Sequence, residues 1–163
     1  MRAVKFLFFS LICLMSANLN AQVQEWIDLG LPSGTLWKNS NEWNRSDDHG
    51  FYTYEAAVRA FGDSLPTEEQ WEELMLKCTW IWDSSKKGYN VKGTNGKSIL
   101  LPAAGIRWCS GSVAYVGTDG GYWSFTPGAS EGADCLDFDY EEVYMSANRC
   151  CLGQSVRLVA PRP

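Results

Sequence analysis

General acid–base catalysis most often uses histidine, and this sequence of 163 residues has a single one, His49. His49 lies in the polar stretch NRSDDHG (44–50), where a lone histidine is typical of a solvated loop. The sequence shows no Ser/His/Asp constellation, no spacing of zinc ligands and no phosphate-binding glycine loop. These observations predict a protein that is not an enzyme, with no catalytic residue, no bound metal and no cofactor.

Three acidic residues near the C-terminal end alternate with apolar ones. Asp137, Asp139 and Glu141 are separated by Leu136, Phe138 and Tyr140. In an extended segment this period of two places the carboxylates on one face and the apolar groups on the other. We interpret the acidic face as a solvated outer surface, because calcium prefers six to eight oxygen ligands that converge from loops.

The sequence is also rich in aromatic residues, with eight Trp and seven Tyr. Trp71, Trp80 and Trp82 fall in apolar patterns that favour the core. A second group lies on or beside the later loops, where rings stack on sugars or anchor protein partners, although core packing is the alternative for each of them. Its members are Trp108, Tyr115, Tyr122, Trp123, Tyr140 and Tyr144.

The segment 122–152 collects side chains suited to contact with a ligand. The pieces that frame it, GGYWS (120–124) and GQSVRLV (153–159), are apolar or turn-forming and suit a scaffold. Functional residues tend to lie on loops that a rigid framework holds. We therefore predict ligand binding through Trp123, Asp134, Asp137, Asp139, Tyr140, Tyr144, Asn148 and Arg149.

Two helices are expected to position this segment. In SLPTEEQWEELMLKC (64–78), Thr67 and Gln70 form a capping box, and a stripe at i, i+3, i+4 and i+7 predicts a buried face. An earlier helix begins after Thr53 and stops at Gly62. The buried stripe consists of Trp71, Leu74, Met75 and Cys78.

Short strands surround these helices. The dipeptide Asn95-Gly96 between two apolar runs is a strong hairpin signal. The segments 110–121 and 141–153 are rich in glycine or turn residues, and we predict loops there. Strands are expected at 23–29, 35–38, 89–94, 97–102, 103–108, 122–126, 135–140 and 155–160. Two helices followed by a cluster of strands predict an α+β domain.

The first residues have the pattern of a secretory signal peptide. Arg2 and Lys5 precede the apolar run 6–15, and a polar stretch ends at Ala21. We predict a signal peptide at 1–21, a single domain at 22–163 and a location in the cell envelope or outside the cell. No segment is apolar for long enough to span a membrane. The acidic balance, −5 for the whole chain, argues against nucleic acid as a partner.

Export permits disulfide bonds, but the sequence does not define them. The odd number of cysteines after residue 21 leaves at least one thiol unpaired. Several pairings remain open among Cys78, Cys109, Cys135, Cys150 and Cys151.

Five segments together resemble a known family. The motifs IDLGLPSGTLW (27–37), YEAAVRAFGDSLPTEEQWEEL (54–74), NGKSILLPAAGIR (95–107), GGYWS (120–124) and GQSVRLV (153–159) are similar to those of the Fibrobacter succinogenes major paralogous domain. This family occurs in secreted proteins of gut Bacteroidetes and resembles the C-type-lectin-like fold of formylglycine-generating enzymes. The resemblance implies two helices packed on a small twisted antiparallel sheet with long loops.

The sequence departs from that fold's functional motifs. Cys150 and Cys151 are adjacent, whereas formylglycine-generating chemistry uses a spaced pair of cysteines. The Glu-Pro-Asn and Gln-Pro-Asp motifs of calcium-dependent sugar sites are absent. These departures argue against a formylglycine-generating enzyme and against a calcium-dependent sugar site.

Three hypotheses follow for the function. The first is a secreted or surface-exposed module that presents its C-terminal loops to a glycan or protein ligand. Because retroelements diversify the C-terminal codons of some proteins with a similar frame, 134–152 is a candidate diversified segment. The second is a self-associating structural or assembly subunit of a cell-surface appendage, and the third is an enzyme.

Overall fold

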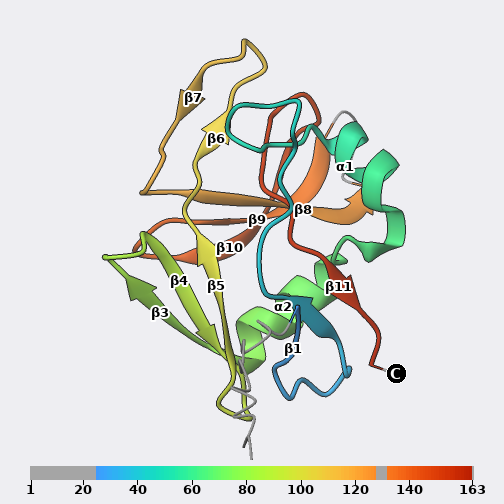
Figure 1. The fold of residues 1–163 in the computed structure, drawn as a ribbon, viewed down its shortest axis with the longest axis vertical. Helices are drawn as coiled ribbons and strands as arrows, with labels where there is room; N and C mark the ends of the chain where they lie inside the picture. Colours follow the sequence, from blue (N-terminus) through green and yellow to red (C-terminus); the bar gives the residue numbers. More distant parts are fainter. Residues whose placement is uncertain (1–24, 128–131, 163) are drawn as a thin grey trace, which may run out of the picture.

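The computed structural model describes residues 25–127 and 132–162 (Figure 1). The predicted signal peptide and its cleavage site lie outside these residues. The fold is mostly β, with 43% strand and 16% helix, and its strands form four small sheets. The expected α+β, C-type-lectin-like fold is therefore wrong.

The helices begin and end close to the predicted positions. Thr67 accepts a hydrogen bond from the backbone N–H of Gln70, and the Gln70 side chain accepts one from the N–H of Thr67, so the capping box is confirmed. Thr53 caps the first helix in the same way, through the N–H of Ala56. The helical elements are α1 (Tyr54–Phe61), the 3-10 turn η1 (Gly62–Ser64) and α2 (Glu68–Lys77).

The sheets are antiparallel, and each joins two or three short strands. Their orders are β1-β2-β11, β3-β4-β5, β6-β7 and β10-β9-β8. The strands are β1 (Trp26–Asp28), β2 (Leu36–Lys38), β3 (Thr79–Asp83), β4 (Gly88–Lys92), β5 (Ser98–Pro102), β6 (Ile106–Arg107), β7 (Val113–Ala114), β8 (Gly120–Pro127), β9 (Gly132–Phe138), β10 (Val143–Arg149) and β11 (Val159–Ala160).

Three strands lie in segments for which no strand was predicted from the sequence. The predicted turn-rich stretch 141–153 contains β10, which pairs with β9 along its whole length. The predicted loop 110–121 contains β7, and the apolar run after α2 is β3. In β10, Val143 and Met145 pack against the core while Tyr144 between them is exposed. Pairing with β9 therefore keeps residues 143–149 extended, although several of them are of types common in turns.

The β8–β9–β10 sheet separates two hydrophobic clusters. Tyr122 and Leu136 belong to the cluster that includes α2, β1–β2 and β4–β5, whereas Trp123 and Cys135 belong to the cluster that includes α1. Of the predicted α2 stripe, Trp71 and Leu74 are fully buried, which confirms the core face, while Met75 and Cys78 are only partly buried at its edge. The predicted solvated outer face on β9 is wrong at Asp137, which is partly buried.

One charged side chain lies inside this core. Arg157 is 1% exposed and donates three hydrogen bonds: Nε to Asn41 Oδ1 at 2.9 Å, Nη1 to the Lys38 carbonyl at 2.7 Å and Nη2 to the Leu100 carbonyl at 2.6 Å. Burial lowers the pKa of its guanidinium from the ordinary value. The side chain thus joins β2, β5 and the C-terminal segment, which are distant in sequence.

Candidate functional site

A pocket of about 170 Å³ lies between the β6–β7 hairpin and the end of the β8–β9–β10 sheet. In Figure 1 this hairpin projects above the sheet. The aromatic residues that line the pocket are Trp108, Tyr115 and Tyr144. Its acidic and amide lining consists of Asp119, Asp137, Asp139 and Asn148. The remaining lining is small or apolar: Gly105, Gly120, Gly121, Ile106, Phe138 and Leu152.

The hairpin positions two of the aromatic rings. Trp108 closes the turn, since its backbone N–H donates to the Ser112 carbonyl at 2.8 Å, and its ring meets Tyr115 edge-on with centroids 6.3 Å apart. Tyr115 has a φ of +62°, a left-handed conformation that costs a non-glycine residue roughly 1–3 kcal/mol. Its carbonyl accepts the N–H groups of Thr118 and Asp119, which holds this conformation. The exposed Tyr115 ring is thus fixed at the pocket by its own turn.

The sheet supplies the opposite wall. Tyr144 of β10 lies directly across from Asp137 of β9. Asn148 comes from the same face of β10 and donates a hydrogen bond to Asp137 Oδ2 at 2.9 Å. Burial raises the pKa of the Asp137 carboxyl, while the Asn148 hydrogen bond opposes this shift. Asp139 follows the end of β9, where its Oδ1 accepts the N–H groups of Glu141 and Glu142 at 2.7 and 3.0 Å.

Glycine residues bring the hairpin and the sheet together. Gly105 has a φ of +83°, and its N–H donates to the Asp119 carbonyl at 2.8 Å. A Cβ atom at Gly105 would collide with the Ala114 carbonyl, and one at Gly120 would collide with the Phe138 ring. Residues without side chains at both positions therefore allow the close approach of the two walls.

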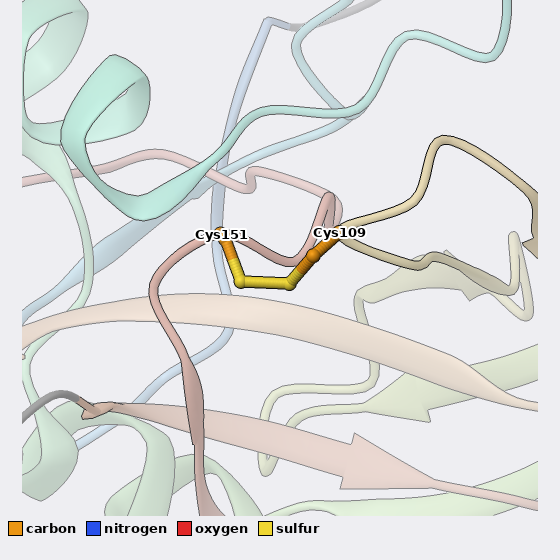
Figure 2. Close-up of a disulfide and its surroundings, with 2 residues drawn as sticks. All are labelled: Cys109 and Cys151. Atoms are coloured by element: carbon orange, nitrogen blue, oxygen red, sulfur yellow. A yellow bond between two sulfur atoms is a disulfide. The ribbon is translucent and has the colours of Figure 1, made fainter.

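A disulfide between Cys109 and Cys151 joins the hairpin to the segment after β10 (Figure 2). Their Cα atoms are 5.2 Å apart, a separation within the range of natural disulfides. Arg107 ties the hairpin to a different segment, the loop between β2 and α1, since its Nε lies 2.9 Å from Asp47 Oδ2. The three other cysteines in the described part of the chain are free thiols: Cys78, Cys135 and Cys150.

We expect reduction of this disulfide to lower the free energy of unfolding by about 2–4 kcal/mol, since it closes a loop with a sequence separation of 42. Chemical denaturation with and without dithiothreitol measures the effect. The double variant Cys109→Ala/Cys151→Ala should match the reduced protein and should not respond to the reductant. An unfolding midpoint that is the same in both conditions would contradict the bond. Among the free thiols, burial raises the pKa of Cys78 to about 11.

Half of the predicted ligand-binding residues line the pocket. These are Asp137, Asp139, Tyr144 and Asn148.

The other four predicted residues lie elsewhere. Trp123 is fully buried, and its indole N–H donates to the Tyr52 carbonyl at 2.7 Å, so it belongs to the core. Tyr140 and Arg149 are exposed outside the pocket lining. Asp134 lies on the other face of the sheet, where its charge raises the pKa of Glu68.

Three of the aromatic and acidic residues that line the pocket were not predicted from the sequence as ligand-binding residues. Trp108 and Tyr115 were noted as aromatic residues beside loops, and their spacing around a Gly/Ser-rich turn is the signal that could have selected them. Asp119 carries no sequence signal, because only the close approach of β8 to the hairpin places it at the pocket.

Comparison of the chain with models of protein families, with curated proteins and with solved structures found no match. Among the described residues, no group of three or more His, Cys, Asp and Glu side chains is arranged to hold a metal ion. No helix in the same part of the chain has the length and hydrophobicity needed to cross a membrane.

Proposed function

We propose that this protein is a non-enzymatic binding module that acts outside the cytoplasm and holds part of a glycan or protein ligand in the pocket between the β6–β7 hairpin and the sheet. The pattern of the first residues and the resemblance to secreted Bacteroidetes proteins support the location. The observation that carries the binding role is the pocket itself, which three partly exposed aromatic rings line together with three Asp and one Asn. Rings in such a position supply contact area at low entropic cost.

The size of the pocket limits what it can hold. Pockets for whole small molecules commonly measure about 300–1,000 Å³. At about 170 Å³ this pocket offers the space of roughly six water molecules. It therefore suits one end group of a ligand, such as a single sugar ring or a single side chain, with the rest of the ligand outside.

The rigidity of the walls also favours binding. The disulfide, the Arg107–Asp47 ion pair and the strand pairing fix the hairpin and the sheet before any ligand arrives. A preformed site loses little conformational entropy on binding.

A glycan and protein array tests this proposal with the oxidised protein. Trp108→Ala and Tyr144→Ala should each weaken binding to the selected ligand by at least about tenfold, the usual size of an aromatic contact at the centre of an interface. Leu76→Ala is the control, because Leu76 is 79% exposed on α2 and lies outside the pocket. Equal binding by all four proteins would show that the ligand contacts another surface.

A further inference from the structure

The pocket contains negative charge but no basic residue. Asp119, Asp137 and Asp139 line it, and no Lys, Arg or His is among the lining residues. Of the ion pairs formed by residues 25–127 and 132–162, none involves these three carboxylates. The charge of the pocket is therefore not balanced by a neighbouring cation.

Hydrogen bonds satisfy these carboxylates only in part. Asp137 accepts one from Asn148 at Oδ2 and a long one of 3.7 Å from the Cys135 thiol at Oδ1. A single oxygen of Asp139 accepts two backbone N–H groups. Within the described ranges, the Asp119 side chain makes no hydrogen bond. These carboxylates also affect the Tyr144 hydroxyl. Burial is the largest cause of its raised pKa, and negative charges nearby raise the pKa further: those of Asp137, Glu142, Asp139 and Asp119. The pocket thus favours a positively charged group.

An unpartnered side chain lies behind the same lining. Gln154 is 0% exposed, and neither its amide nitrogen nor its amide oxygen has a hydrogen-bond partner among the described residues. A Cβ atom at Gly121 would lie 3.2 Å from Asp137 Oδ1 and 3.2 Å from Gln154 Oε1. Both groups would crowd a Cβ atom at residue 121, so the glycine lets the Asp137 carboxylate and the buried Gln154 amide lie close together behind the pocket lining.

Aromatic rings complete the arrangement. Trp108 is 40% exposed, Tyr115 is 53% exposed and Tyr144 is 45% exposed, and all three line the pocket. The face of an aromatic ring attracts an organic cation through its quadrupole, and indole does so most strongly. A neutral sugar would use the rings and would donate hydroxyl hydrogen bonds to the carboxylates, but it would leave their negative charge uncompensated.

We propose that the pocket binds a guanidinium group, as at the end of an arginine side chain, and this inference rests on the proposed binding function. A planar guanidinium carries five N–H donors in a fixed fork and stacks on aromatic faces, whereas an ammonium is a compact, strongly hydrated point charge. The small volume of the pocket admits such an end group. The source is either a free guanidinium compound or an arginine of a protein.

A titration followed by ¹H–¹⁵N chemical shifts tests the inference. The probes are N-acetyl-arginine amide, its neutral isostere N-acetyl-citrulline amide, N-acetyl-lysine amide and the peptide Gly-Gly-Arg-Gly-Gly. The arginine probe should shift the Trp108 indole signal and bind at least tenfold more tightly than the citrulline probe, with the lysine probe between them. Tighter binding of the peptide than of the capped amino acid identifies a protein as the source, and equal binding identifies a free compound.

Asp119→Asn should reduce the affinity for the arginine probe at least fivefold. Folding should be unaffected, because no residue in the described ranges donates a hydrogen bond to this carboxylate. Glu72→Gln removes the same charge from an exposed position of α2 outside the pocket and should change nothing. Equal binding of the arginine and citrulline probes would overturn the inference. A neutral glycan that shifts the Trp108 and Tyr144 signals while the arginine probe does not would also overturn it, yet would leave the proposed binding function intact.

Discussion

Replacement of Arg157 with alanine should lower the free energy of unfolding by roughly 3–5 kcal/mol, because it leaves three acceptors in the core without this donor. The acceptors belong to Asn41, Lys38 and Leu100, so the loss loosens three segments at once. Arg157→Lys should recover only part of this energy, since one ammonium group cannot reproduce the fork of the guanidinium. Urea denaturation followed by tryptophan fluorescence measures both variants.

The matched control is Arg45→Ala, which removes an exposed arginine from the loop after β2. Its unfolding free energy should stay within about 0.5 kcal/mol of the wild-type value. If Arg157→Ala behaved like Arg45→Ala, the three hydrogen bonds would contribute nothing to the fold, and the account of the C-terminal segment would be wrong.

The second large effect is expected at Leu74. Leu74→Ala should lower the free energy of unfolding by about 2–5 kcal/mol, the usual range for a cavity left by a buried leucine. Leu74 is fully buried in the cluster that joins α2 to the sheets. Thermal unfolding and urea unfolding of the variant and the wild type under identical conditions measure this loss of free energy.

The same helix offers a control with the same substitution. Leu76 lies two positions further along α2 and is 79% exposed, so Leu76→Ala should leave the stability nearly unchanged. Equal losses in the two variants would show that α2 does not present the Trp71 and Leu74 face to the core. A loss at Leu76 alone would place the core on the opposite face.

The elements that the sequence predicted correctly are those defined by local chemistry. The capping box of Thr67 and Gln70 fixes the start of α2 through interactions within one turn. The Asn95-Gly96 turn likewise joins β4 to β5, because glycine at 96 accepts a φ of +85°. Such signals act within a few residues and are visible in the sequence.

The elements that the sequence did not predict depend on distant partners. Residues 143–149 look turn-forming because they include Ser146, Asn148 and Arg149, yet β9 supplies a complete set of pairing partners for them. Asp137 looked solvated from its alternation alone, but Asn148 of the neighbouring strand donates a hydrogen bond to it and the side chain is partly buried. The overall topology came only from a family resemblance, and the β-rich arrangement of four sheets does not follow it.

In the candidate site, too, some features follow from residue type and others only from packing between distant segments. Asp137, Asp139, Tyr144 and Asn148 were selected because their types suit contact with a ligand, and β-pairing brings them to one pocket. Trp123 has an equally suitable type, but its neighbours in the fold bury it completely. Residue type therefore identified candidates, and only the packing of the sheet separated contact residues from core residues.

A crystal structure of the oxidised protein with the ligand selected on the array tests the central claim most directly. The account predicts ligand atoms between the Trp108 and Tyr144 rings, with polar contacts to Asp137 or Asp119. A ligand bound at the opposite face of the sheet near Asp134, or at the exposed surface of Arg149, with the pocket unoccupied, would contradict it.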